Sequence, residues 1–209
     1  MANIFDLFKK IEKGENTPVG PVTHLIVGLG NPGAEYALTR HNAGFLALDR
    51  FAERLGARID RARFRALVGE ASFAGHHVLL LKPQTFMNLS GEAVQEALAF
   101  YKIPPENLIV LCDDISFDAG VVRIRRRGSH GGHNGLRNIA AMIGSEEYPR
   151  IKLGVGKKPR PDYDLVDWVL GKMPPADCEA LAARAEDADA AVALILQGKI
   201  DEAMNKYSK

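Results

Sequence analysis

The stretch LIVGLGNPG, residues 25–33, joins an apolar run to a glycine-rich turn. Its three glycines match the G-x-G-x-x-G pattern of dinucleotide-binding folds. In those folds the pattern opens a helix, and a ribose-binding acid follows about 20 residues later at the end of a second strand. The available acids, Asp49 and Glu53, lie instead inside a predicted amphipathic helix. We therefore reject a nicotinamide enzyme, expect no cofactor, and interpret Pro32-Gly33 as a turn after a strand.

Apolar periodicity predicts strands that alternate with helices along the rest of the chain. Strands are expected at about 24–29, on both sides of a turn at Gly75, and at 107–114, 121–127 and 150–156. Helices are expected at about 43–55 with Asn42 as its cap, at 91–102, at 134–143, and through the tail from Pro174. This order indicates an α/β fold in one domain: a twisted mixed β-sheet flanked by α-helices, with a helical carboxy-terminal tail.

Residues 1–20 are interpreted as an extension, and residues 21–209 as the α/β domain. The extension combines a short amphipathic helix at 3–13 with a linker that contains proline and glycine. A membrane-surface or partner helix is one alternative, but the segment has few cations, so we expect packing or disorder and no role in activity. It has no uninterrupted apolar segment of a secretory signal, and no run in the chain approaches the roughly 20 apolar residues of a membrane span.

Charge is distributed unevenly, although the net charge is only +1. Residues 119–160 contain ten Lys or Arg and two acids, whereas residues 161–209 contain ten acids and five Lys or Arg. A basic patch in the middle segment favours a phosphate-bearing partner, with a merely solvated strand face as the alternative. The two cysteines, Cys112 and Cys178, are too few for a disulfide framework and indicate a reducing, cytoplasmic location.

Four segments then carry a specific resemblance. GLGNPGAEYALTRHNAG (28–44), PQTFMNLSG (83–91), CDDISFDAGVVRIR (112–125) and GSHGGHNGL (128–136) resemble, in order and spacing, the motifs of bacterial peptidyl-tRNA hydrolases. The resemblance extends over about residues 22–207. It implies hydrolysis of the ester that joins a peptide to tRNA, with peptidyl-tRNA as the partner, no membrane, no metal and a monomeric enzyme.

The resemblance also implies a catalytic pair. His41 would be the general base, because a histidine can take a proton from water near neutral pH. Asp113, which ends the apolar run LIVLCD, would orient the imidazole, and by the family pattern it serves rather than Asp114. The sequence lacks a G-x-S-x-G serine elbow, and Cys112 within an apolar strand is interpreted as a core residue. Activated water is therefore the simplest nucleophile.

Other residues match the family's substrate-binding positions. Asparagine amides can bind peptide carbonyls or a developing oxyanion, and basic side chains can bind phosphate. The resemblance assigns substrate or tRNA binding to Asn31, Tyr36, Phe86, Met87, Asn88, Asn134, Arg123, Arg125 and Lys152. Arg123 stands where the family often has lysine. Tyr163 and Trp168 are expected to pack under the tail, and the resemblance implies that this tail is a carboxy-terminal helical lid over the cleft.

Two rival functions remain. An RNA-binding protein on the same fold without catalysis would keep the arginines but would not need His41 and Asp113. A general small-ester or amide hydrolase would not need a basic strand. A metal enzyme is rejected, because His130 and His133 are spaced i, i+3 without a third ligand cluster in the sequence.

Overall fold

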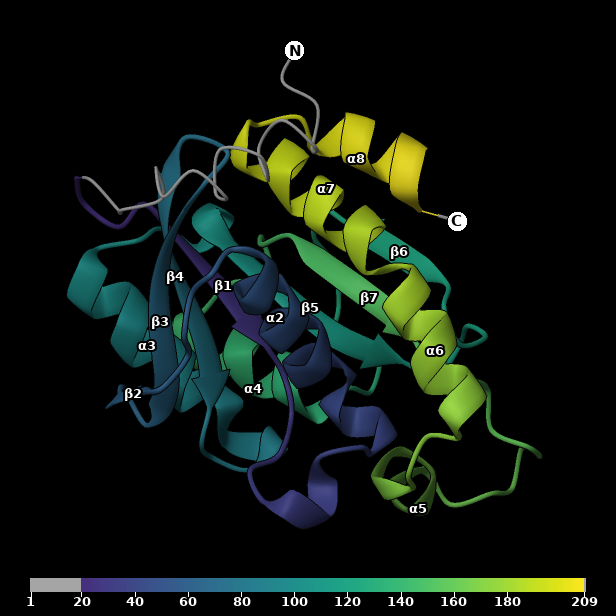
Figure 1. Cartoon of the computed structure of the whole chain (residues 1–209). Helices are drawn as coiled ribbons and strands as arrows, with labels where there is room; N and C mark the ends of the chain where they lie inside the picture. The colour runs from purple at the N-terminus through teal and green to yellow at the C-terminus, as the bar shows by residue number, and fades with distance from the viewer. Residues whose placement is uncertain (1–19, 209) are drawn as a thin grey trace.

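The apolar run before the glycine-rich turn forms the central strand of the sheet, β1 (His24–Gly28) (Figure 1). The computed structural model describes residues 20–208. On either side of β1 lie β4 (His76–Pro83) and β5 (Leu108–Asp114), and β7 (Arg150–Gly154) lies beyond β5. All three of these pairings are parallel. The carboxyl ends of four neighbouring strands therefore meet at one edge of the sheet, which is where open α/β sheets bind ligands.

The outer strands make the sheet mixed, as predicted. β3 (Ala66–Phe73) pairs antiparallel with β4 across the hairpin turn at Gly75, and β6 (Val122–Arg125) pairs antiparallel with β7. β2 (Arg61–Arg63) was not predicted and pairs antiparallel with β3. The sheet has seven strands in the order β2-β3-β4-β1-β5-β7-β6.

Helices cover both faces of the sheet (Figure 1). α2 (Ala43–Arg54) and α7 (Ala185–Leu196) share one apolar core with alternate strand residues such as Ile26. On the opposite face, α3 (Ser90–Tyr101) and α4 (Asn134–Ile143) pack on the other residues of the same strands. The chain thus adopts the predicted α/β arrangement of a mixed sheet flanked by helices, with both faces of the parallel strands buried.

The tail is helical from Pro174, as predicted. α6 (Pro175–Ala183) leads into α7, and α8 (Ile200–Tyr207) packs against β6. A shorter helix, α5 (Leu165–Leu170), precedes the tail and was not predicted. It is the part of the carboxy-terminal region that borders the cleft described below.

Short 3-10 helices occupy the loops beside the sheet. η1 (Ala34–Tyr36) and η2 (Arg40–Asn42) connect β1 to α2. η3 (Met87–Leu89) connects β4 to α3, and η4 (Pro105–Asn107) precedes β5. η2 and η3 carry several of the predicted site residues to the carboxyl edge of the parallel strands.

Gly28 and Gly30 allow the end of β1 to pack closely against the start of α2. A Cβ at Gly28 would lie 2.4 Å from the carbonyl oxygen of Gly44, and one at Gly30 would lie 2.6 Å from the ring of Phe45. Both contacts are shorter than any real side chain tolerates, so the start of α2 can lie directly against the end of β1 only because these positions lack side chains. This packing brings η2 to the carboxyl end of the strand.

The helix predicted at 3–13 lies outside the described residues, and the division of the chain at residue 20 stays a prediction. Among residues 20–208, no helix is long and apolar enough to cross a membrane.

Candidate active site

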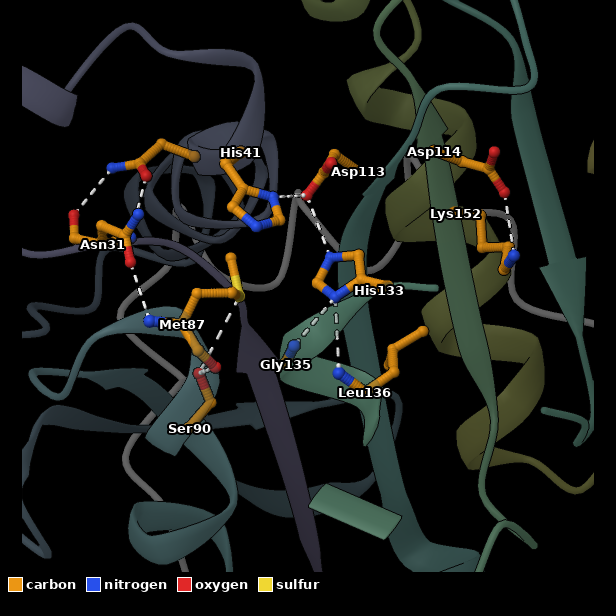
Figure 2. Close-up of polar contacts among 11 residues, drawn as sticks. Asn31, His41, Met87, Ser90, Asp113, Asp114, His133, Gly135, Leu136 and Lys152 are labelled. Carbon is orange, nitrogen blue, oxygen red and sulfur yellow. Dashed lines mark hydrogen bonds and ion pairs between the residues drawn. The ribbon is translucent and has the colours of Figure 1, made fainter. Parts of the chain in front are cut away.

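Asp113 lies near the carboxyl end of β5 and is contacted by two histidines (Figure 2). Its Oδ1 lies 2.8 Å from Nδ1 of His41 and 3.0 Å from Nε2 of His133. The carboxyl is only 4% exposed and His41 only 8%. Burial by itself raises the pKa of Asp113, but the charges and hydrogen bonds of both histidines outweigh it and hold this pKa well below its usual range. Asp113 is therefore an anion at neutral pH.

The hydrogen bonds fix the proton positions on both imidazoles. A carboxylate only accepts, so the nitrogens that face Asp113, His41 Nδ1 and His133 Nε2, must each carry a proton. His133 Nδ1 in turn accepts from the backbone N–H groups of Gly135 and Leu136, at 3.1 and 3.4 Å, and so caps α4. His133 is thus a neutral imidazole in one tautomer. In neutral His41, Nε2 is the nitrogen without a proton, and it has no hydrogen-bond partner within the described chain.

A second network holds Asn31 beside these groups. The side chain of Asn42 accepts from the Asn31 N–H at 2.8 Å and donates to the Asn31 carbonyl at 2.9 Å. Asn31 Oδ1 accepts from the N–H of Met87 at 2.7 Å. Asn42 occupies the N-cap position of α2, as predicted, but its side chain makes no capping bond and braces Asn31 instead. The bracing ties η2 to the end of β1 and to η3.

The amide of Asn31 is consequently oriented. Its oxygen accepts from Met87, which leaves Nδ2 as a donor without a partner among residues 20–208. Met87 itself is buried, with its sulfur 3.9 Å from the hydroxyl of Ser90 (Figure 2). Asn31 and Met87 therefore form one rigid side of the site.

A cleft opens over the histidine–aspartate cluster, with a cavity of about 180 Å³. One wall comes from the 130–134 loop and the start of α4, and the facing wall comes from Leu165, Val166 and Val169 of α5. His41 and Asp113 both line this cavity. The cleft thus combines a charged catalytic-type cluster with an apolar wall, a combination that is typical of small-molecule and peptide sites.

The other predicted substrate-binding residues differ in whether they line the cleft and in how exposed they are. Asn134 lines the cleft and is exposed, whereas Asn88 is exposed on η3 and does not line the cavity. Tyr36 and Phe86 meet edge to face with 6.3 Å between ring centroids, and Phe86 is 55% exposed. The exposed Phe86 and the half-buried Tyr36 thus form an aromatic pair on the loops that carry Asn31 and Met87.

The predicted basic residues share one face of β6 and β7. Arg123 pairs with Lys152 in register and donates to the carbonyl oxygen of Ser208 at 2.6 Å. Lys152 lines the cleft and forms an ion pair of 2.8 Å with Asp114. Burial raises the pKa of Asp114, but its bonds to Lys152 and to a backbone N–H outweigh this and leave the pKa lowered. Arg125 is exposed and has no ion pair within residues 20–208.

His41, Asp113 and His133 together resemble a possible metal site. Their ligand atoms lie within 4.8 Å of one another. Both ring nitrogens that face the carboxylate carry protons in this arrangement, so a cation would have to displace them. The hydrogen bonds account for the cluster without a cation, and the rejection of a metal site stays a prediction.

Three residues of the site were missed from the sequence. His133 was considered only with His130, whereas in the structure it contacts Asp113 from the start of α4. Asn42 was interpreted as a cap, and Arg40 was not considered. All three lie within the family-like segments at 28–44 and 128–136, which was the available signal.

Comparisons with known proteins agree with this geometry. The family model described as Peptidyl-tRNA hydrolase matches residues 25–209. A peptidyl-tRNA hydrolase of Caldicellulosiruptor bescii is 49% identical over 87% of this chain and 95% of its own length. One from a Thermoanaerobacter species is 48% identical over 88% of this chain and 99% of its own.

A solved structure shows the same fold. The crystal structure of peptidyl-tRNA hydrolase from Acinetobacter baumannii has a TM-score of 0.83 with this chain, at 38% identity. The match covers 89% of this chain and 94% of the other. With the family model and the relatives, this similarity shows that the chain is a hydrolase and belongs to the peptidyl-tRNA hydrolase family.

Proposed function

We propose that this chain hydrolyses the ester between peptide and tRNA in peptidyl-tRNA, releasing free tRNA and peptide, with water activated by His41. The observation that carries the proposal is the 2.8 Å contact between His41 Nδ1 and the buried Asp113 carboxylate. This contact leaves the unprotonated Nε2 of His41 available at the cleft. A base held in one tautomer by a carboxylate is the arrangement that general-base catalysis needs.

In the proposed reaction, His41 Nε2 takes one proton from a water molecule while the water oxygen attacks the ester carbonyl carbon. A tetrahedral oxyanion forms, and its collapse breaks the bond to the ribose oxygen. The proton on Nε2 passes to that oxygen, so the products are a peptide carboxylic acid and a tRNA hydroxyl. Asp113 remains ionised and stabilises the imidazolium that exists between these steps.

Oriented amide donors support the acyl part of this proposal. Asn31 Nδ2 is a donor fixed by the bond from Met87 to Oδ1. A preorganised donor of this kind can bind the ester or peptide carbonyl and stabilise the oxyanion. Asn88 and Asn134 extend the amide surface, and Tyr36, Phe86 and Met87 supply apolar contact for the peptide.

A thiol nucleophile fits the structure poorly. Cys112 is fully buried within β5. Burial, reinforced by the charge of Asp113, raises the pKa of the Cys112 thiol well above its usual range. A thiol that neither ionises nor reaches solvent is inert, which leaves water as the nucleophile.

The tRNA part is assigned to the basic face of β6 and β7. Arg123, Arg125 and Lys152 lie on this face, and Lys152 also reaches the cleft. Phosphates bound there would place the 3′ end of tRNA toward the catalytic cluster. We also infer that the enzyme acts in the cytoplasm, as a monomer.

The test compares one tRNA in two acylated forms. N-acetylated aminoacyl-tRNA should be cleaved rapidly, and the same aminoacyl-tRNA with a free amine at least about a hundredfold more slowly, because the site would bury an unpaired ammonium. The nearby carboxylates are already engaged, Asp113 by two histidines and Asp114 by Lys152. Equal rates would indicate a general esterase, and cleavage of neither would favour an RNA-binding protein.

A further inference from the structure

Arg40, which directly precedes His41, is buried against the end of α5. Its Nη1 lies 3.5, 3.3 and 3.2 Å from the carbonyl oxygens of Trp168, Gly171 and Lys172. The Arg40 N–H also donates to the Gly171 carbonyl at 3.1 Å. The side chain is only 6% exposed. One guanidinium therefore binds the carbonyl groups at the carboxyl end of α5, where a cation is favourable.

The same guanidinium stacks on an aromatic ring of α5. Its central carbon lies 3.6 Å from the ring centroid of Trp168, which is a close cation–π contact. The indole N–H of Trp168 donates to the carbonyl of Gly156 at 3.1 Å, and Tyr163 meets the indole edge to face. The expectation that Trp168 packs under the tail stays a prediction; the contacts that the structure shows for its side chain are with Arg40, Tyr163 and Gly156.

Backbone bonds strengthen the connection between the two segments. Thr39 forms an isolated antiparallel bridge with Lys172, and the Met173 N–H donates to the Leu38 carbonyl at 2.9 Å. The residues that directly follow α5 are therefore also joined by backbone contacts to the residues that directly precede Arg40.

Each joined segment carries one side of the cleft. η2 carries His41, and α5 carries the apolar wall of Leu165, Val166 and Val169. Leu165 and Val166 are 42% and 57% exposed, so the wall presents apolar surface to whatever occupies the cleft. Arg40 therefore connects the segment that carries His41 to the segment that carries this apolar wall.

We infer that Arg40 is a positioning residue: its clamp on Trp168 and the α5 carboxyl end sets the apolar wall against His41, and this wall binds the acyl part of the substrate. The inference rests on the proposed function for the identity of the substrate. It assigns to Arg40 a role in binding the peptide rather than the tRNA, because the guanidinium binds α5 and the residues directly after it and is too buried to meet a phosphate.

The first test compares Arg40→Gln with Arg50→Gln, a matched loss of an exposed arginine on α2. In the full chain, Arg40→Gln should speed amide hydrogen exchange at residues 165–171 by about tenfold or more, with β5 unchanged. It should raise KM for N-acetylated aminoacyl-tRNA about tenfold, lower kcat less, and leave Kd for deacylated tRNA unchanged. Arg50→Gln should change none of these quantities.

A second pair of variants tests the clamp from the α5 side, even if Arg40→Gln does not fold. Trp168→Leu removes the aromatic face and should reproduce the faster exchange and higher KM, whereas Trp168→Phe keeps a face for the guanidinium and should stay near wild type. Trp168 is the only tryptophan of the chain, so its emission should also shift to longer wavelength in Arg40→Gln.

Three results would overturn the inference: unchanged exchange in α5, faster exchange with an unchanged KM, or equal losses in KM and in Kd for deacylated tRNA. If wild-type protein cleaves no acylated tRNA, the proposed function fails and, with it, the acyl-binding role. The exchange and emission results still decide independently whether Arg40 clamps α5.

Discussion

His133 has two hydrogen-bonding roles at the residue scale. Its Nδ1 caps α4, and its Nε2–H donates to Asp113. Because Nδ1 accepts hydrogen bonds from the start of α4, the ring proton of the neutral imidazole must lie on Nε2. Nε2 is therefore a donor to the Asp113 carboxylate. Asp113 therefore receives two N–H donors on the same oxygen, which keeps it anionic in a buried place and fixes the direction in which it holds His41.

The two roles of His133 can be separated. Asparagine is also a good helix cap but is too short to reach Asp113, so His133→Asn should keep the cap and lose the donor. We expect turnover to fall about tenfold, with the free energy of unfolding within about 0.5 kcal/mol of wild type. His133→Ala should lose turnover and also about 1 kcal/mol of stability. Turnover and urea unfolding measure the two effects, and normal turnover in His133→Asn would show that the donor is dispensable.

Asn31 offers a test of the amide donor. Asn31→Asp keeps an oxygen to accept from Met87 but replaces the Nδ2 donor with an acceptor. We expect kcat/KM for N-acetylated aminoacyl-tRNA to fall about a hundredfold, because a donor to the carbonyl becomes a repulsive oxygen. A steady-state assay measures this loss. A variant that folds and retains more than about a third of wild-type kcat/KM would exclude the donor role.

At the scale of elements, β6 and β7 present their basic side chains unequally. Arg123 is bound to a backbone carbonyl, and Lys152 is paired with Asp114. The neighbours Arg126 and Arg127 pair with Asp201 and Glu147. Arg125 has no such partner within the described residues, so it can bind a phosphate without first losing another contact.

Arg125→Ala should therefore weaken tRNA binding and reduce the slope of log K against log salt by about one. Turnover at saturating substrate should change much less, because the residue lies away from the cluster. Titrations of deacylated tRNA at several salt concentrations measure the slope. Arg58→Ala, which removes an exposed arginine elsewhere, is the matched control. An unchanged affinity and slope in Arg125→Ala would place the tRNA on another surface.

At the scale of the whole molecule, His24 links stability to pH. Burial, together with the neighbouring His76 ring, lowers the pKa of His24 to about 4. The unfolded chain binds this proton near pH 6.5, so the unfolded state holds more protons between these two values. The contribution of His24 to the free energy of unfolding is therefore fully present above about pH 6.5 and is lost as the pH falls toward about 4. Since His24 is only half-buried, we expect a loss of about 2 kcal/mol.

Urea unfolding of wild type and His24→Gln at about pH 7 and about pH 4.5 measures this term. Glutamine cannot titrate, so the variant should lose about 2 kcal/mol less than wild type over the same interval. An equal loss of unfolding free energy in both proteins would show that His24 does not contribute to the pH dependence of stability.

Much of the fold could be predicted because its strands and helices carry strong apolar periodicity. β1, the hairpin of β3 and β4, β5, α2, α3 and α4 all fall within a few residues of their predicted bounds. β2 was missed because its three residues, Arg-Ala-Arg, are exposed and show no alternation. α5 was missed because six residues are too few for a helical period to stand out.

The site could be predicted only in part. The family-like motifs predicted His41 and Asp113 as partners, and the structure brings them into contact. The contact of His133 with Asp113 depends on the position of α4 relative to β5, which no local pattern encodes. Arg40 looks like a surface residue in sequence, because its partners lie some 130 positions later in the chain. Such long-range polar contacts depend on tertiary packing, and only a structure shows them.

The central claim is that His41 activates water. Its most direct test is the single-turnover cleavage of N-acetylated aminoacyl-tRNA by wild type and His41→Asn, with the enzyme in excess over substrate and over its Kd. We predict a rate about 10²–10⁴-fold lower in His41→Asn, with substrate Kd within about threefold of wild type. A His41→Asn rate within about fivefold of wild type would contradict the mechanism, because another group would then activate the nucleophile.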